Sequence, residues 1–265
     1  MTTLYIESVG VFAPGLVGWP QASLILSGAQ PYFPAALPAL KPVLLAPDVR
    51  RRTTEHIRLA IEVASEAAHE LGETAKELAT VFASSESDGQ IAHDICLEVV
   101  KEAPQVSPTR FHNSVSNAAA GYWSMAVGSQ QPSTSVAAYD ATFAAGLIEA
   151  AAQVAADTPR VLLVTHDMPM PDPLIRVRPM TAPFGVAFVL SRERSPRAKA
   201  KLKLAVESHS DESTLADGAL EQLRLGNPAA RVLPLLAVLA NCRSSETVLP
   251  YLDNLSLRVR IDPCQ

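Results

Sequence analysis

The sequence predicts an α/β protein with a mixed sheet. Apolar runs typical of strands alternate with helical periods along the chain. Two of these runs, 78–84 and 161–165, are mostly apolar, as strands covered on both faces are. Residues 141–156 are almost all small and apolar, which predicts a helix buried in the molecule. At 265 residues, we expect one domain that spans 1–265.

The elements follow in order. Leu4–Phe12 is a strand that Ala13-Pro14-Gly15 breaks, and a proline-rich loop runs over 29–47. Apolar residues recur at helical intervals from Ile57 through Ala60 and Ile61, and Gly72 ends this predicted helix. Pro104 and Pro108 end another helix. The expected helices are 19–27, 48–71, 91–102, 117–128, 141–156, 214–225 and 229–240, and the strands are 4–12, 78–84, 133–138, 161–165, 185–190, 201–207 and 255–261.

Composition excludes several classes of protein. A net charge of −5 argues against a general nucleic-acid binder. No run reaches the length of a membrane helix, and no secretory signal is visible, so we expect a cytoplasmic protein. The cysteines at 96, 242 and 264 have no paired or metal-like spacing, and we expect neither a metal nor a cofactor.

The run 111–169 has the order helix, turn, strand, sharp turn, Ala-rich helix, strand. It closely resembles the N-terminal half of the β-ketoacyl synthases, which have the thiolase-like fold. The resemblance is specific over 1–190, strongest over 111–121 and 133–150, and leaves 191–265 as a short divergent α/β tail. It implies a mixed sheet with a buried central helix.

Asp140 departs from the family at its most important position. Synthases carry a turn of the type S-T-A-C-A-S-G, whose cysteine attacks acyl thioesters; this chain has Ala137-Ala138-Tyr139-Asp140-Ala141-Thr142-Phe143. A carboxylate cannot usefully replace a thiolate in storing an acyl chain. Asp140 is also a favoured residue for a helix N-cap, and we expect it to cap the helix that follows.

The family's acid–base residues are missing as well. The second half of a synthase supplies two histidines and a lysine in runs such as N-A-H-G-T and G-H-x-x-G. The histidines of this chain are at 56, 69, 93, 112, 166 and 209, and none lies in such a run. His209 is interpreted as a polar loop residue. We therefore predict no catalytic residue.

Without the nucleophile and the acid–base residues, the chain resembles most specifically the chain-length-factor-like subunits of this family, as in aryl polyene and type II polyketide pathways. These lack the cysteine and pair as heterodimers with a full-length β-ketoacyl-ACP synthase, which meets acyl carrier protein. The resemblance implies an acyl-tunnel gate near Phe111, with the N-x-x-x-G pattern at Asn117 and Gly121. The expected tunnel residues are Phe111, His112, Asn117, Gly121, Tyr122 and Met125. Tyr122 and Trp123 are alternatively core residues.

The strand after this helix is the expected dimer interface. In the family it pairs with its counterpart across the dimer axis, and an unpaired edge favours a partner. The predicted interface residues are Ser133, Thr134, Ser135, Val136, Ala137 and Ala138. Two alternatives remain: an acyl-thioester decarboxylase or hydrolase that uses Asp140 or His112, and a homodimeric acyl-binding scaffold.

Overall fold

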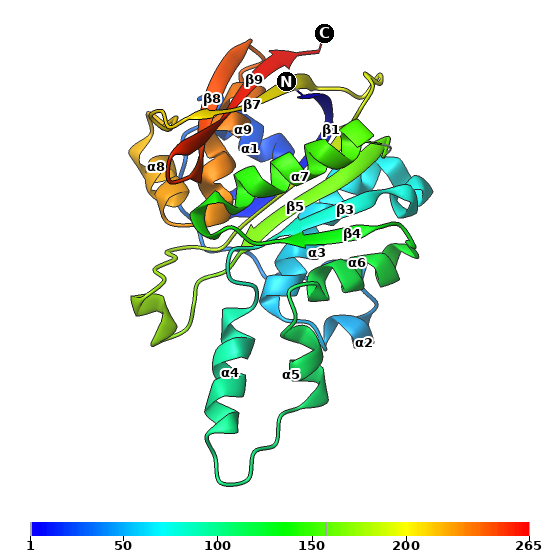
Figure 1. Ribbon diagram of the computed structural model, residues 1–265, viewed down its shortest axis with the longest axis vertical. Helices are drawn as coiled ribbons and strands as arrows, with labels where there is room; N and C mark the ends of the chain where they lie inside the picture. The colour runs from blue at the N-terminus through cyan, green and yellow to red at the C-terminus, as the bar shows by residue number, and fades with distance from the viewer. Residues whose placement is uncertain (1, 157, 265) are drawn as a thin grey trace.

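The computed structural model describes residues 2–156 and 158–264. They form a single mixed sheet with helices on both faces (Figure 1). The strands are β1 Thr2–Ala13, β2 Leu16–Val17, β3 Ala79–Ala83, β4 Ser133–Val136, β5 Arg160–Asp167, β6 Phe184–Ser191, β7 Ala200–Ser208, β8 Ser245–Leu252 and β9 Leu255–Pro263. The helices are α1 Trp19–Leu26, α2 Pro47–Arg50, α3 Glu55–Ala68, α4 Gly89–Val99, α5 Pro108–Asn113, α6 Ala118–Val127, α7 Thr142–Ala156, α8 Gly218–Leu225 and α9 Leu233–Ala240. Short 3-10 turns are η1 His69–Glu77, η2 Tyr139–Ala141, η3 Leu174–Arg176 and η4 Pro228–Val232.

The strand order is β4-β3-β5-β6-β1-β7-β9-β8, and β2 pairs with β1. Parallel pairing is confined to β4-β3-β5, while β6, β1, β7, β9 and β8 pair antiparallel. The predicted mixed sheet is confirmed. The tail does not form a separate unit, because β7 hydrogen-bonds directly to β1 and brings β9 and β8 with it.

Two hydrophobic layers cover the faces of the sheet. On β5, Val161 and Leu163 face one layer and Leu162 and Val164 face the other, as the alternation of a strand requires. One layer contains α7, α1 and α9, and the other contains α3 and α6 (Figure 1). The buried strands that the sequence predicts are thus covered on both sides.

The Ala-rich helix α7 lies close to the sheet because Gly146 has no side chain. A Cβ there would come within 3.0 Å of the Ala83 side chain on β3 and 3.1 Å of Leu163 on β5. The inner face of α7 is buried, but Ala152, Ala155 and Ala156 are exposed. The expectation of a helix buried all round is therefore wrong at its outer face and its C-terminal end.

Three helix predictions need correction. The single helix expected over 48–71 is divided: α2 ends at Arg50, and α3 starts afresh after Thr54, whose hydroxyl accepts a hydrogen bond from the Ile57 N–H. Gly72, at φ 52°, bends the chain inside η1. The helix expected from 214 begins at Gly218, after the N-cap Asp217, and the helix expected over 229–240 is split into η4 and α9.

Strand β8 and helix α5 were not predicted. Helices α4 and α5, with the loop between them, form an arm (residues 89–113) that extends away from the sheet (Figure 1). In the part of the chain that the structure describes, no helix is long and apolar enough to cross a membrane.

Candidate functional site

Asp140 lies in a sharp turn between β4 and α7. Tyr139 has a left-handed backbone at φ 52°, which is costly for a bulky residue. Thr142 fixes the turn: its hydroxyl accepts from the Ala138 N–H at 3.0 Å and donates to the Tyr139 carbonyl at 2.7 Å. Asp140 therefore stands at the tip of a strained turn that leads into a buried helix.

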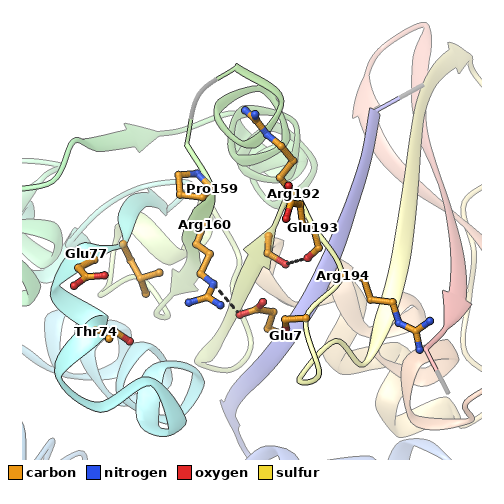
Figure 2. A pocket seen from close by; sticks show the side chains of 11 residues that line it. Glu7, Thr74, Glu77, Pro159, Arg160, Arg192, Glu193 and Arg194 are labelled. Atoms are coloured by element: carbon orange, nitrogen blue, oxygen red, sulfur yellow. Dashed lines mark hydrogen bonds and ion pairs between the residues drawn. The ribbon is translucent and has the colours of Figure 1, made fainter.

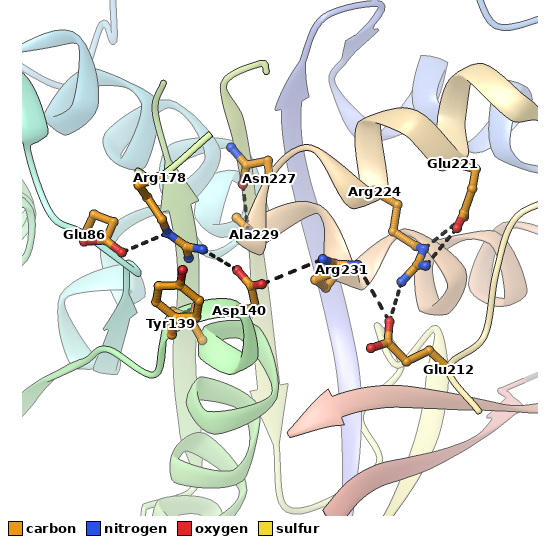
Figure 3. Close-up of polar contacts among 11 residues, drawn as sticks. Glu86, Tyr139, Asp140, Arg178, Glu212, Glu221, Arg224, Asn227, Ala229 and Arg231 are labelled. Carbon is orange, nitrogen blue, oxygen red and sulfur yellow. Dashed lines mark hydrogen bonds and ion pairs between the residues drawn. The ribbon is translucent and has the colours of Figure 1, made fainter. Parts of the chain in front are cut away.

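The carboxylate of Asp140 does not cap α7. Its Oδ1 accepts a hydrogen bond from Arg178 Nη1 at 2.7 Å, and its Oδ2 lies 4.0 Å from Arg231 Nη2 (Figure 3). The helix begins two residues later, at Thr142. The capping prediction is wrong, because two arginines distant in sequence take up the carboxylate.

Arg178 is held on three sides. Its guanidinium lies 3.5 Å from the centre of the Tyr139 ring, and its Nε donates to Glu86 at 2.9 Å (Figure 3). Burial disfavours the charged form of Arg178, but the hydrogen bond and charge of Asp140 outweigh this effect and raise its pKa. The arginine remains a cation that ties the loop before β6 to the turn.

The ion pairs continue into the tail of the chain. Arg231 lies 3.7 Å from Glu212, which pairs with the buried Arg224 at 2.8 Å; Arg224 also pairs with Glu221 at 2.7 Å (Figure 3). Burial disfavours the charged form of Arg224, but the hydrogen bonds that it donates to Glu221 and Glu212 outweigh this effect and raise its pKa. The tail thus anchors the turn electrostatically as well as extending the sheet.

This arrangement is poorly suited to covalent chemistry. Arg178 hydrogen-bonds to one carboxylate oxygen and Arg231 lies near the other, and both cations favour the resting anion over a nucleophile or general base. The Asp140 side chain is 43% exposed at the edge of a cavity of about 440 Å³. His209 lines the same cavity, a proximity that the sequence analysis missed. Cys96 and Cys242 are exposed elsewhere, on α4 and after α9.

The predicted tunnel residues divide into two groups. Phe111 and Met125 are 65% and 64% exposed. Asn117 and Gly121 are exposed too, four residues apart on the same face of α6 as Met125. These residues are exposed, Phe111 on α5 in the arm and the other three on one face of α6; their role in a tunnel stays a prediction.

Tyr122 instead belongs to the core. It is 5% exposed, and its hydroxyl donates to Asn113 Oδ1 at 3.0 Å. Trp123 is 1% exposed. His112 packs edge-on against the Tyr122 ring, with ring centres 5.9 Å apart. Tyr122 and Trp123, the two aromatic residues of α6, are therefore core residues, as the alternative interpretation of the sequence had it.

Strand β4 forms one edge of the sheet, where the sequence places the dimer interface. It pairs with β3 on one side, and Ser133 and Ser135 are exposed. The strand ends at Val136, so Ala137 and Ala138 belong to the turn. The interface itself remains a prediction.

A buried polar cluster that the sequence did not reveal lies where β3 and β5 end. Ser84 donates to Asp167 Oδ1 at 2.9 Å and lies 3.1 Å from His56 Nε2. Burial raises the pKa of Asp167 to about 7 and lowers that of His56 to about 4. Burial, together with the His56 charge, lowers the pKa of His166 well below its ordinary value. Such groups are invisible in sequence because they are far apart along the chain.

The opposite end of β5 carries a second charged cavity, of about 370 Å³ (Figure 2). Its floor contains Glu7, which is 2% exposed and lies 3.2 Å from Arg160. Arg192 is directed instead to the carbonyl groups at the end of α7. In the described residues there is no group of three or more His, Cys, Asp or Glu side chains that could hold a metal ion.

The sheet order, the helix packed on the sheet after a strained turn and the tip position of Asp140 define a thiolase-like fold. The family model for the β-ketoacyl synthase N-terminal domain matches residues 25–240. The chain therefore belongs to the β-ketoacyl synthase family. A search of curated protein sequences found no significant match.

Solved structures share this fold across the whole chain. A chain of the ketosynthase ApeO–chain length factor ApeC complex from Xenorhabdus doucetiae is 20% identical, with a TM-score of 0.76; the match covers 98% of this chain and 100% of that one. The ishigamide ketosynthase/chain length factor is 12% identical, with a TM-score of 0.75, and the match covers 99% and 100%. A β-ketoacyl synthase from Burkholderia phymatum is 10% identical, with a TM-score of 0.71 and full coverage of both chains.

Proposed function

We propose that this protein is a non-catalytic ketosynthase-like subunit of the chain-length-factor type. The observation that carries the proposal is Asp140, which stands at the position of the family's nucleophile and is held by Arg178 and Arg231. Such a carboxylate stores no acyl group. The turn keeps its shape through ion pairs and the Thr142 hydroxyl, so the fold persists without the chemistry.

The partner in this proposal is a full-length β-ketoacyl-ACP synthase, through which the complex meets acyl carrier protein. Support comes from similar solved structures: two are ketosynthases with chain length factors, and a third, 10% identical, is a ketosynthase in complex with an acyl-carrier protein. The exposed face around Phe111 and Met125 and the sheet edge at β4 are the surfaces that a partner would cover. Single exposed apolar residues are ordinary, but an open strand edge is a place where another chain can pair.

In this role the outer face of α5 and α6 closes the far end of the partner's acyl tunnel. A bulky side chain there limits tunnel depth by excluding volume. Products belong to fatty-acid-like or polyketide chains, as in aryl polyene pathways.

The test is co-expression with a full-length synthase, followed by co-purification and mass spectrometry of the products. The proposal expects a stable complex, and elongation that requires both chains. The chain alone, given malonyl- and acyl-carrier protein, should form no ketoacyl product and no acyl adduct. Decarboxylation or hydrolysis of an acyl thioester by the isolated chain would contradict the proposal and favour that alternative. Elongation by either chain alone would also contradict the proposal.

A further inference from the structure

A cavity of about 420 Å³ separates the arm from the body of the protein. His56, at the start of α3, and Asp88, just before α4, line it with Ile91, Met168 and Pro169. Its size suits a small organic molecule. The cavity is distinct from the one at Asp140, whose lining residues are all different.

Asp88 presents a buried oxygen without a partner. Asp88 is 7% exposed, and its Oδ1 accepts from the Ile91 N–H at 3.0 Å as the N-cap of α4. Its Oδ2 is buried and has no hydrogen-bond partner in 2–156 and 158–264. An unpaired buried carboxylate oxygen is costly. Because Asp88 already occupies the positive end of α4, an incoming anion would meet a negative charge there.

His56 adds an acceptor to the lining of the same cavity. Asp167 Oδ1 accepts from Ser84 Oγ, from the Ser85 N–H and from Ser85 Oγ, so the Ser84 proton points at Asp167. Ser84 must then accept from His56, which places the ring proton on Nε2. His56 is 7% exposed and neutral near pH 7, since burial lowers its pKa to about 4. Its Nδ1 is therefore an unprotonated acceptor.

The charges around the cavity favour a cation. Arg52 and Arg110 line it, against Glu55, Asp88 and Asp94, so negative charges exceed positive ones by one. Arg110 and Asp94 lie 3.9 Å apart and offset each other. Of these five side chains, only that of Asp88 is buried.

We propose that this cavity binds a small primary amine, with its ammonium group on Asp88 Oδ2 and His56 Nδ1. An ammonium group supplies three N–H donors and the missing positive charge. The apolar body of the ligand packs against Ile91 and Met168. This site is independent of the pairing function proposed above.

The test is calorimetric titration of the purified chain with three probes of one size: benzylamine, benzyl alcohol and benzoate. Benzylamine should bind in the millimolar range or tighter, at least about tenfold better than benzyl alcohol, and benzoate should not bind. Asp88→Asn should weaken benzylamine binding at least about tenfold while keeping the helix cap, because Asn is an equally good N-cap.

Asp217→Asn is the matched control, since Asp217 caps α8 in the same way, through the Ala219 and Leu220 N–H groups. It should leave binding unchanged. Equal affinity for benzylamine and benzyl alcohol, equal affinity in Asp88→Asn and the natural chain, or no benzylamine binding at about 10 mM would each overturn the proposal. If Asp88→Asn unfolds, His56→Gln replaces it, and unchanged binding in that variant counts against the site.

Discussion

At the scale of single residues, the role that the sequence predicts for the Asp140 side chain differs from the role that the structure shows. In sequence it looks like a helix cap; in the structure it is an ion-pair partner of Arg178 and Arg231. A cap uses only the acceptor oxygen of the side chain, whereas an ion pair needs its charge. Replacement by Asn separates the two, because Asn caps well but carries no charge.

Asp140→Asn should lower the free energy of unfolding by about 1 kcal/mol, nearly as much as Asp140→Ala, because Arg178 is 11% exposed and loses its nearest anion. Urea denaturation measures this. Asp172→Asn breaks a pair whose partners are 73% and 65% exposed and should change stability by less than about 0.5 kcal/mol. An Asn variant as stable as the natural chain would restore the capping interpretation.

The raised pKa of Asp167 predicts how the free energy of unfolding changes with pH. Its folded pKa is about 7, against an ordinary 3.8, so between these values the folded chain holds a proton that the unfolded chain releases. Its contribution to stability is therefore present at low pH and lost as pH rises, by up to about 1.4 kcal/mol per pH unit. His56 and His166, whose pKa values are lowered, act in the opposite direction.

Asp167→Asn should isolate this contribution, since both histidines remain. Relative to the natural chain, the variant should gain stability by about 1 kcal/mol or more as pH rises from about 4.5 to about 6.5. Denaturation midpoints across that range measure the difference. Parallel stability curves would show that Asp167 ionises normally in the folded state.

At the scale of elements, the sequence predicts most of the sheet but few of the breaks. Strands β1, β3, β5 and β6 were found because their apolar runs are short and rich in β-branched and aromatic residues, which favours a strand over a helix. The break between α2 and α3 was missed because residues 50–56 are all polar and carry no periodic signal, so that only the Thr54 hydroxyl marks the new start. Strand β8 was missed because Ser245–Leu252 alternates weakly and contains Pro250.

The edge strand β4 should carry the partner interface. Ser135→Arg places a long cation on an exposed position of β4 and should reduce co-purification with the synthase at least about tenfold, because the charge would be buried without a counterion. Ser245→Arg is the matched control, on β8 at the other edge of the sheet. Equal loss in both variants, or in neither, would mean that β4 is not the interface.

Phe111 should limit product length if α5 closes the tunnel. Phe111→Ala opens volume at the tunnel end, so products should become longer by one or two two-carbon units while the complex stays intact. Phe33→Ala removes another exposed phenylalanine, 71% exposed in the loop before α2, and should leave products unchanged. Mass spectrometry of the released acyl chains measures product length for both variants. An unaltered length distribution in Phe111→Ala would mean that Phe111 is not the gate.

At the scale of the whole molecule, the tail could not be predicted from the resemblance. Residues 200–263 contribute three strands to the same sheet, and Arg224 and Arg231 extend ion pairs to the turn. These contacts join positions distant in sequence, and such pairs leave no local pattern. The same reason hid His209 beside Asp140 and His56 beside Ser84. Local sequence patterns therefore predict the strands and helices, whereas the residues that meet at each site are known only once the chain is folded.

The most direct test of the central claim follows the acyl group in the assembled complex by intact-protein mass spectrometry. With substrate present, the acyl adduct should appear on the synthase alone, and Asp140→Asn in this chain should leave product formation unchanged. A synthase whose nucleophilic cysteine is replaced by alanine should give neither adduct nor product. An acyl adduct on this chain, or loss of product in a folded and assembled Asp140→Asn complex, would contradict the account.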